Sequence, residues 1–296
     1  MNIESEKKFA ASLSITSNGL IIIFKLLAGI FTGSISIISE AIHSMSDFLA
    51  SVLTFFAVIR SSKPADKSHP FGHGKYEDVA GFIEGLLIVL ASFFIILEAC
   101  KKIIHSSSLE FDSTWGIVVM TIAVVANLLV SHYLGFVAKK TDSIALRADA
   151  KHLSTDVYSS LGVLIGLVLI KLTGISLLDP LIAIFVALII LKAGINITKE
   201  TLNNLLDGTL PDSDIKIIEN ILKDNNKILG FKNLKSRKSG QNRDIDITLL
   251  CEGNITLREC HKICDTIEEK IKQSLPNTLI TIHCEPFGTN KDIKKN

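Results

Sequence analysis

The first two thirds of the chain alternate between long apolar runs and short polar connections. A helix needs about 20 predominantly apolar residues to cross the ~30 Å hydrocarbon layer of a bilayer. Six runs reach that length and are predicted to span a membrane: 10–31, 35–59, 79–100, 115–137, 148–171 and 178–200. Together they form a predicted six-helix transmembrane domain over residues 1–206. An even number of spans places both ends of this domain on the same side of the membrane.

The pattern changes after about residue 206, where shorter segments of mixed polarity replace the apolar runs. Five of them have the periodicity of helices or strands: helix-like 211–223, strand-like 229–236 and 244–250, helix-like 256–273 and strand-like 279–284. Residues 207–288 are therefore predicted to form a small α+β domain with the order αββαβ, followed by a polar tail over 289–296. A domain of about 80 residues is only marginally stable alone, which favours dimerisation.

Composition supports an integral membrane protein. Of the 296 residues, 48% are hydrophobic, and the formal net charge is +1. The mean hydropathy of +0.41 is too high for an ordinary soluble domain, and the near-neutral charge argues against nucleic-acid binding. The first residues do not have the pattern of a cleavable signal peptide. Four of the five cysteines lie in the polar C-terminal third, without the spacing of a secreted disulfide framework, so a reducing compartment is expected there.

Lysine and arginine predict the orientation, because cytoplasmic connections are enriched in these residues. The basic segments are the N-terminus and the second and fourth connections, with Lys7, Lys8, Arg60, Lys63, Lys67, Lys75, Lys139, Lys140 and Arg147. Both termini are therefore predicted to be cytoplasmic, in a multi-pass protein of the cell or inner membrane. Lys25, inside the first span, is expected to extend its ammonium toward the outer interface.

Two polar stripes of the same form interrupt the second and fifth spans. Glu40, His43 and Asp47 recur at helical spacing in one, and Asp149, His152 and Asp156 in the other. Charges are costly in a bilayer and need a partner, a cavity or an ion. One imidazole and one carboxylate from each helix make a set of two nitrogens and two oxygens, which suits a tetrahedral divalent ion, above all zinc. Glu40 and Asp149 would support this site or lie in water at a helix end.

A second group of metal-ligand residues lies in the connection after the second span. Asp66, His69 and His73 are spaced along a segment with turn residues at Pro70 and Gly72. One carboxylate and two imidazoles would make an open three-ligand site. The alternative is a polar loop whose histidines contact only water.

These features resemble the cation diffusion facilitator family, and the resemblance covers nearly the whole chain. It rests on the six spans, the polar stripes, the run His69-Pro-Phe-Gly-His-Gly-Lys75 and the αββαβ domain. The resemblance implies a ferredoxin-like cytoplasmic domain that dimerises and regulates, and a homodimeric antiporter that exchanges cytoplasmic metal for protons by alternating access. The transport site would be His43, Asp47, His152 and Asp156, with zinc as the expected ion. The cargo is a divalent cation, no bound cofactor is expected, and the protein is not an enzyme.

The soluble domain departs from the pattern that the resemblance implies. His261, His283 and Glu285 fall at positions where several members hold a regulatory metal pair, but Lys232 and Thr248 replace two histidines. Three cysteines next to these histidines leave two interpretations open: Cys260, Cys264 and Cys284. They either contribute sulfur ligands to a substitute site or are ordinary half-buried residues.

Other functions remain as alternatives. The same residue types also bind iron, manganese, cobalt and cadmium, so the sequence does not decide the metal. A metal-sensing membrane protein that does not transport is a second possibility, which flux measurements would distinguish. A membrane metalloenzyme is disfavoured, because the sequence has no His-Glu-x-x-His motif and a four-ligand protein site leaves no position for catalytic water.

Overall fold

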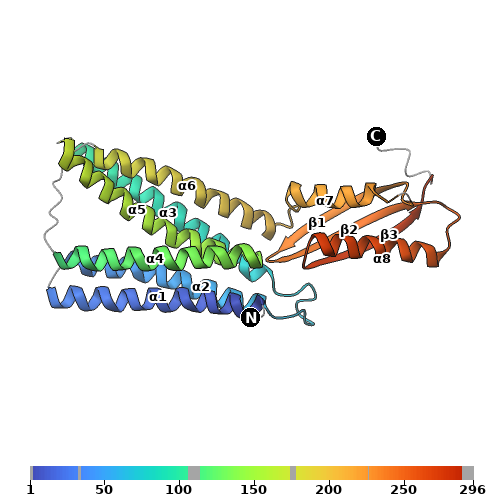
Figure 1. Cartoon of the computed structure of the whole chain (residues 1–296), viewed down its shortest axis with the longest axis horizontal. Coiled ribbons are helices and arrows are strands. Elements are labelled where there is room, and N and C mark those ends of the chain that lie inside the picture. Colours follow the sequence, from blue (N-terminus) through green and yellow to red (C-terminus); the bar gives the residue numbers. More distant parts are fainter. Residues whose placement is uncertain (1–2, 33–34, 106–113, 174–177, 226, 289–296) are drawn as a thin grey trace. The chain divides into compact units, whose positions relative to one another are not determined.

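The computed structural model describes residues 3–32, 35–105, 114–173, 178–225 and 227–288, and within these ranges the side chains of some helical stretches lie outside the description. The chain divides into two compact units, Met1–Leu202 and Asn203–Asn296. The first unit is helical and the second combines helices with a sheet (Figure 1).

The helical unit contains six long helices. Their bounds are α1 Ile3–Thr32, α2 Ile35–Ser61, α3 Lys75–His105, α4 Thr114–Thr141, α5 Ile144–Thr173 and α6 Leu178–Leu205. α1 packs against α2 and α4, whereas α5 packs against α2, α3 and α4. This arrangement brings α2 and α5, which carry the two polar stripes, into direct contact.

Four of these helices are long and apolar enough to cross a membrane within the described residues. The qualifying stretches are Ile3–Ala28 in α1, Lys75–Lys101 in α3, Thr121–Thr141 in α4 and Pro180–Leu205 in α6. α2 and α5 are as long, at 27 and 30 residues, but they carry the charged stripes and parts of them lie outside the description. The fold is therefore a helical transmembrane domain joined to a small α+β domain, as the sequence predicted.

Small residues allow the helices of the first unit to approach closely. Ala10, Ala57, Ala80 and Ala138 are buried in one cluster. α3 and α6 come closer still at Gly85, where an added Cβ would lie only 2.6 Å from Thr198 Oγ1. Small residues at helix interfaces are typical of membrane proteins, where packing rather than burial from water holds helices together.

The expected position of Lys25 is wrong. Its side chain is only 7% exposed, and its Nζ donates a hydrogen bond of 2.8 Å to Ser44 Oγ on α2. The ammonium therefore lies between two helices instead of extending along α1 to an interface. A hydroxyl partner on the neighbouring helix makes this burial tolerable.

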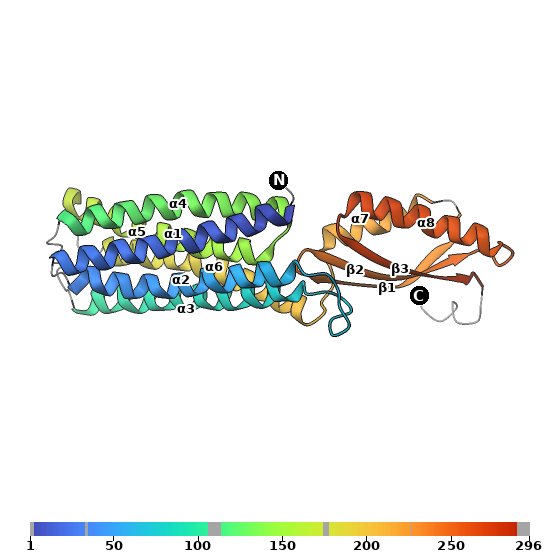
Figure 2. The same ribbon diagram turned by 90° about the horizontal axis from the view of Figure 1, so that it is seen from below.

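The second unit has the predicted order αββαβ. It comprises α7 Asp212–Lys223, β1 Gly230–Ser239, β2 Asn242–Cys251, α8 Leu257–Ser274 and β3 Thr278–Pro286. β2 is the central strand, antiparallel to β1 and parallel to β3. Figure 2 shows α7 and α8 on the same side of this sheet. The parallel pair requires a crossover, and α8 supplies it.

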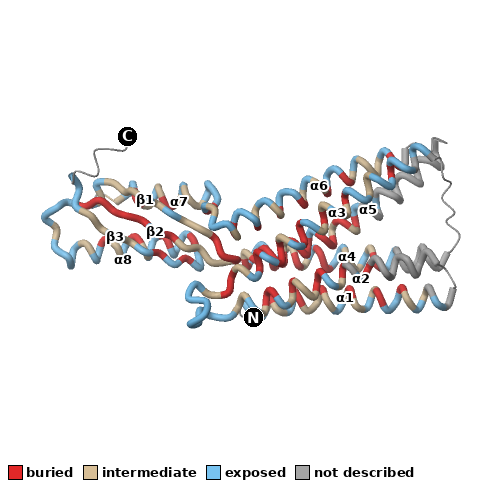
Figure 3. The backbone as a smooth tube through the Cα atoms, turned by 180° about the vertical axis from the view of Figure 1, so that it is seen from behind, coloured by how far each residue is buried: buried red, intermediate tan, exposed pale blue. Residues whose placement is uncertain are grey.

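The core of the second unit lies between the two helices and the sheet. Ile245, Ile247 and Leu249 alternate along β2 and are almost fully buried, and they face Ile263 and Ile267 on α8. Figure 3 shows the buried residues of β2 as a continuous stretch. A capping box fixes the start of α8, at the residue where the helix-like segment was predicted to begin. Thr256 accepts a hydrogen bond from the Glu259 amide, and the Glu259 carboxylate accepts one from the Thr256 amide.

Candidate metal centres

α2 and α5 bring three of the predicted ligands together. The ligand atoms of Asp47, His152 and Asp156 all lie within 4.8 Å of one another. His152 Nε2 is 3.2 Å from Asp47 Oδ1, and both residues are buried. The helical spacing explains the arrangement, because His152 and Asp156 are one turn apart on the same face of α5.

The residue at which α5 begins determines how far into the helix His152 lies. The apolar run predicted a helix from residue 148, but the helix begins at Ile144. It follows a turn in which Asp142 has a positive φ of 52°, and the Leu146 amide donates to Ser143 Oγ. His152 therefore lies about two turns into the helix rather than at its end.

The fourth predicted ligand belongs to α2. The side chains of His43 and of Glu40 lie outside the described residues. His43 is one helical turn before Asp47 in the same helix. Its part in the site stays a prediction.

Hydrogen bonds from α1 and α2 surround the neighbouring acid. Asp149 is fully buried and accepts a hydrogen bond of 3.4 Å from Ser51 Oγ, so its expected alternative position in water is wrong. Ser51 is in turn 2.9 Å from Ser14 Oγ and accepts a hydrogen bond from Asn18. Ser14 and Asn18, one turn apart in α1, were not among the residues predicted from the sequence. Small polar residues at helical spacing were the available signal.

Some buried polar atoms at the site have no hydrogen-bond partner among the described residues. His152 Nδ1 is buried and has no hydrogen-bond partner among the described residues. Glu84 of α3 accepts a hydrogen bond from Thr54 of α2 through Oε1, while its buried Oε2 has no such partner among these residues. Buried polar atoms are rarely left unsatisfied. A polar environment next to Asp47 and Asp156 is compatible with a charged cargo.

The connection between α2 and α3 forms a second cluster. The ligand atoms of Asp66, His69 and His73 lie within 4.8 Å of one another, and the two imidazole rings are 4.4 Å apart. His73 Nε2 is 3.4 Å from Asp66 Oδ2. His73 Nδ1 lies 3.2 Å from the Pro64 carbonyl, so Nδ1–H can donate there and leave Nε2 free of its proton. That tautomer presents Nε2 to an ion.

Local hydrogen bonds hold Asp66 as a carboxylate. Its Oδ1 accepts bonds from the Ser68 hydroxyl at 2.7 Å and from the Ser68 and His69 amides at 2.9 and 2.7 Å. These bonds, with the nearby His73, lower the pKa of Asp66 well below its usual range. Asp66 and His69 are exposed whereas His73 is buried, so the cluster opens to solvent on one side.

The three residues predicted in the soluble unit do not form one group. His283 is 3.5 Å from Glu285, and Glu285 is also paired with Lys232 at 2.8 Å. His261 lies on α8, 3.7 Å from Asp265. The metal-ligand clusters found among the described residues do not include His261, His283 and Glu285, and a metal site there stays a prediction.

Comparison with known proteins matches both units to one family. Residues 11–206 match the model of the cation efflux transmembrane domain, and residues 210–287 match ZT_dimer, the cytoplasmic domain of cation efflux proteins. An uncharacterized transporter of Synechocystis is 33% identical over 90% of this chain and 86% of its own length. The cation-efflux pump FieF of Yersinia pestis is 32% identical over 94% and 92%. Protein p34 of Rickettsia prowazekii is 30% identical over 97% and 94%.

The family match and the helices agree on the kind of protein. The transmembrane match covers five of the six helices completely and most of α1. A chain that combines this domain with the cytoplasmic domain is an integral membrane transporter. The chain therefore belongs to the cation diffusion facilitator family and is a divalent cation efflux transporter.

Proposed function

We propose that this protein exports zinc from the cytoplasm in exchange for protons, and that it carries the ion on His43, Asp47, His152 and Asp156. The observation that supports this proposal is the meeting of Asp47 with His152 and Asp156 across the contact between α2 and α5. With His43, the set has two nitrogens and two carboxylate oxygens. Zinc accepts such ligands in a tetrahedral arrangement, with bonds of ~2.0–2.2 Å.

Proton exchange follows from the chemistry of the ligands. An imidazole must be neutral and a carboxylate ionised to bind a metal, so binding competes with protons. An unperturbed imidazole titrates near pH 6.5, within the range that a membrane proton gradient spans. A ligand set with two histidines therefore releases the ion more readily on the side that is more acidic.

The proposed direction of transport rests on topology. The basic residues gather at the N-terminus and in the second and fourth connections, which supports a cytoplasmic location for these segments and for both termini. Labelling of single cysteines introduced at Lys67 and at residue 33 tests this orientation. Access of an impermeant reagent to position 67 from outside intact cells would contradict it.

A homodimer is the proposed assembly. The match of residues 210–287 to ZT_dimer supports it, as does the sheet, whose two helices cover one face only. Cross-linking or mass measurement of the full chain in detergent tests the proposal. A protein that stays monomeric at micromolar concentration would rule out a stable dimer.

Transport by purified protein in vesicles tests the site. We expect Asp47→Ala and His152→Ala to lose proton-driven zinc uptake, since each removes a ligand from the cluster. His132→Ala is the matched control, because His132 is an exposed histidine of α4. Wild-type uptake by either site variant would refute the assignment. Binding of zinc without any flux in the wild type would instead favour a sensor.

The same vesicles identify the cargo. Uptake of zinc, cadmium, cobalt, manganese and ferrous iron is compared at equal free concentrations. We expect zinc and cadmium to be favoured, because imidazole suits borderline ions better than it suits manganese. A preference for manganese would show that the set of two histidines and two aspartates does not select the metal.

A further inference from the structure

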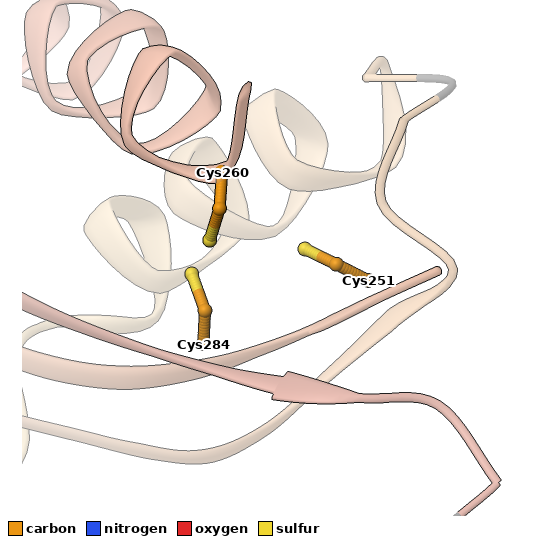
Figure 4. Close-up of side chains that lie close together, drawn as sticks. All are labelled: Cys251, Cys260 and Cys284. Atoms are coloured by element: carbon orange, nitrogen blue, oxygen red, sulfur yellow. The ribbon is translucent and has the colours of Figure 1, made fainter. Parts of the chain in front are cut away.

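Four cysteines from three elements converge at one end of the core of the second unit. Cys251 ends β2, Cys260 and Cys264 lie one turn apart on α8, and Cys284 lies on β3. We call these four residues the sulfur cluster. Figure 4 shows the sulfur atoms of Cys251, Cys260 and Cys284 turned toward a common centre. The metal transport proposed above involves none of them.

The spacing of the sulfur atoms fits a single tetrahedral ion. The sulfurs of Cys251, Cys260 and Cys284 lie within 4.8 Å of one another, and Cys264 Sγ is 3.3 Å from Cys284 Sγ. With metal–sulfur bonds of ~2.3 Å, tetrahedral geometry places sulfur atoms about 3.8 Å apart. Three sulfurs are therefore already within the range that one ion needs, and Cys264, next to Cys284 but outside the group of three, has to turn toward them to become the fourth ligand.

The register of the sheet explains why the cysteines meet. Cys251 continues the buried face of β2 after Ile247 and Leu249, and Cys284 continues the same face on β3 after Ile282. Aliphatic side chains fill the rest of this face. Four of the five cysteines in the chain lie at this one position, and the fifth, Cys100, lies in α3. A preference for core packing alone does not account for such a concentration.

The cluster is closed on one side and accessible on the other. Cys251 is only 2% exposed, whereas Cys260, Cys264 and Cys284 are partly exposed. An ion can therefore reach the sulfurs from solvent while Cys251 closes the inner side.

None of the four cysteines is in a disulfide, so all four sulfurs are available as ligands. All four are free thiols, and 3.3 Å is well beyond a disulfide bond of about 2.05 Å. Burial raises the pKa of the Cys251, Cys264 and Cys284 thiols. Thiols of raised pKa are poor nucleophiles at neutral pH. A thiophilic ion displaces their protons directly, so binding releases protons and weakens as the pH falls.

We propose that Cys251, Cys260, Cys264 and Cys284 bind one thiophilic divalent ion, zinc or cadmium, at a sulfur site separate from the transport site. The all-sulfur donor set selects soft ions over manganese and magnesium. By joining β2, α8 and β3, the ion stabilises the second unit. The stability of the second unit would therefore depend on the concentration of thiophilic metal in the surrounding solution.

Cadmium titration of the reduced full-length protein in detergent tests the proposal. Cadmium–thiolate bonds give a charge-transfer absorption in the ultraviolet that imidazole and carboxylate ligands do not give. We expect this absorption to saturate at one cadmium per chain. Cys260→Ser and Cys284→Ser should weaken cadmium binding by at least ~100-fold, since even indirect partners of ligands contribute 10–100-fold. Cys100→Ser, the matched control, should bind as the wild type does.

Each of the other outcomes also supports or overturns the proposal. A folded wild type without the thiolate absorption, or Cys260→Ser with unchanged absorption, overturns the proposal. Circular dichroism shows whether each variant is folded, and Cys264→Ser replaces any that is not. Finding Cys264 and Cys284 oxidised in protein purified from reducing cytoplasm, with no cadmium bound after reduction, overturns it in favour of a disulfide. The double variant Asp47→Ala, His152→Ala should keep the absorption, so the transport assignment can fail independently.

Discussion

Hydrogen bonds fix the state and orientation of individual side chains in the candidate metal sites. In the loop, Asp66 is held as a carboxylate by Ser68 and His69, and the Pro64 carbonyl orients the His73 ring. Between α2 and α5, Ser51 supports Asp149 beside His152. A ligand that is already ionised and oriented loses less entropy on binding. These hydrogen-bonding groups are therefore as important to affinity as the ligands themselves.

The loop cluster predicts a specific pH dependence. Because the pKa of Asp66 is lowered in the folded loop, its stabilising contribution is present above the ordinary value of 3.8 and is lost only as the pH falls through the lower folded value. Acidification from pH 7.5 to 5.5 therefore leaves Asp66 ionised and protonates histidines. Because an imidazole binds metal only in its neutral form, we expect the zinc affinity of the loop to fall over this range.

The measurement is zinc titration of an Asp47→Ala protein in detergent at several pH values. Asp66→Asn should lower the affinity at every pH but leave its slope against pH unchanged. His69→Ala should reduce that slope. Loss of the pH dependence in Asp66→Asn would show that the carboxylate, and not an imidazole, takes up the proton.

Among the elements, α3 and α6 show how glycine determines helix packing. At Gly85 an added Cβ would lie 2.6 Å from Thr198 Oγ1 and 3.0 Å from the Thr198 amide nitrogen. At Gly194 it would lie 2.9 Å from Ile88 Cγ2. No side chain beyond hydrogen fits at Gly85 without moving the helices apart. The close approach of α3 to α6 therefore depends on these glycines.

Gly85→Ala should destabilise the helical unit. We expect a loss of about 1–3 kcal/mol, the usual effect of overpacking a tight contact. Thermal unfolding in detergent, followed by circular dichroism, measures it. Gly135→Ala is the control, because its Cβ would meet nothing closer than Ala150 Cβ at 4.0 Å. Equal stability of the two variants would mean that α3 and α6 separate without cost.

The sequence predicted the elements better than their contacts. The strand β2 and the start of α8 near Thr256 could be predicted because both depend on residues that are neighbours in the sequence. The predicted span starts at residue 148, directly after Arg147, whereas α5 itself already begins at Ile144. In the structure Arg147 pairs with Glu200 of α6, and Asp149 is buried beside Ser51. A hydropathy scale counts charged residues as unfavourable inside a helix bundle, because it does not include the partners that they find on other helices.

The same limit applies to the candidate sites. Helical spacing placed His152 and Asp156 on one face of α5, but spacing alone does not determine which helix that face contacts. The convergence of Cys251 with Cys284 depends on the parallel register of β2 and β3, in which Cys284 lies opposite Leu249. Register arises from the packed core, so the sequence named Cys260, Cys264 and Cys284 as possible sulfur ligands but did not show that Cys251 lies with them.

In the whole molecule, one buried ion pair joins several helices of the membrane unit. Lys7 of α1 pairs with Glu77 of α3, and both side chains are almost completely buried. Glu77 also accepts hydrogen bonds from Ser61 at the end of α2 and from Ser143 before α5. Four helices are thereby connected at one end of the unit.

Removing one partner of this pair should destabilise the transporter. Glu77→Ala leaves the Lys7 ammonium buried without its carboxylate, and we expect a loss of about 3–5 kcal/mol. The double variant Lys7→Met, Glu77→Leu should lose less than Glu77→Ala, because no charge remains buried. Lys140→Ala is the control, because it breaks the exposed pair with Glu6, worth about 0–1 kcal/mol.

Equilibrium unfolding in mixed detergent micelles compares these variants. A double variant less stable than Glu77→Ala would show that the pair has a net favourable interaction that apolar side chains do not replace. That result would contradict the expectation from burial.

The loop cluster also has a mechanical consequence. α2 ends at Ser61 and α3 begins at Lys75, and the ligands Asp66, His69 and His73 all lie between these ends. An ion held by all three would shorten the connection between α2 and α3, which we call the tether. Any step of the transport cycle that separates the ends must stretch that tether and weakens its hold on the ion. Linkage would make the effect reciprocal: if the three residues hold an ion, we expect the occupied loop to oppose the same step.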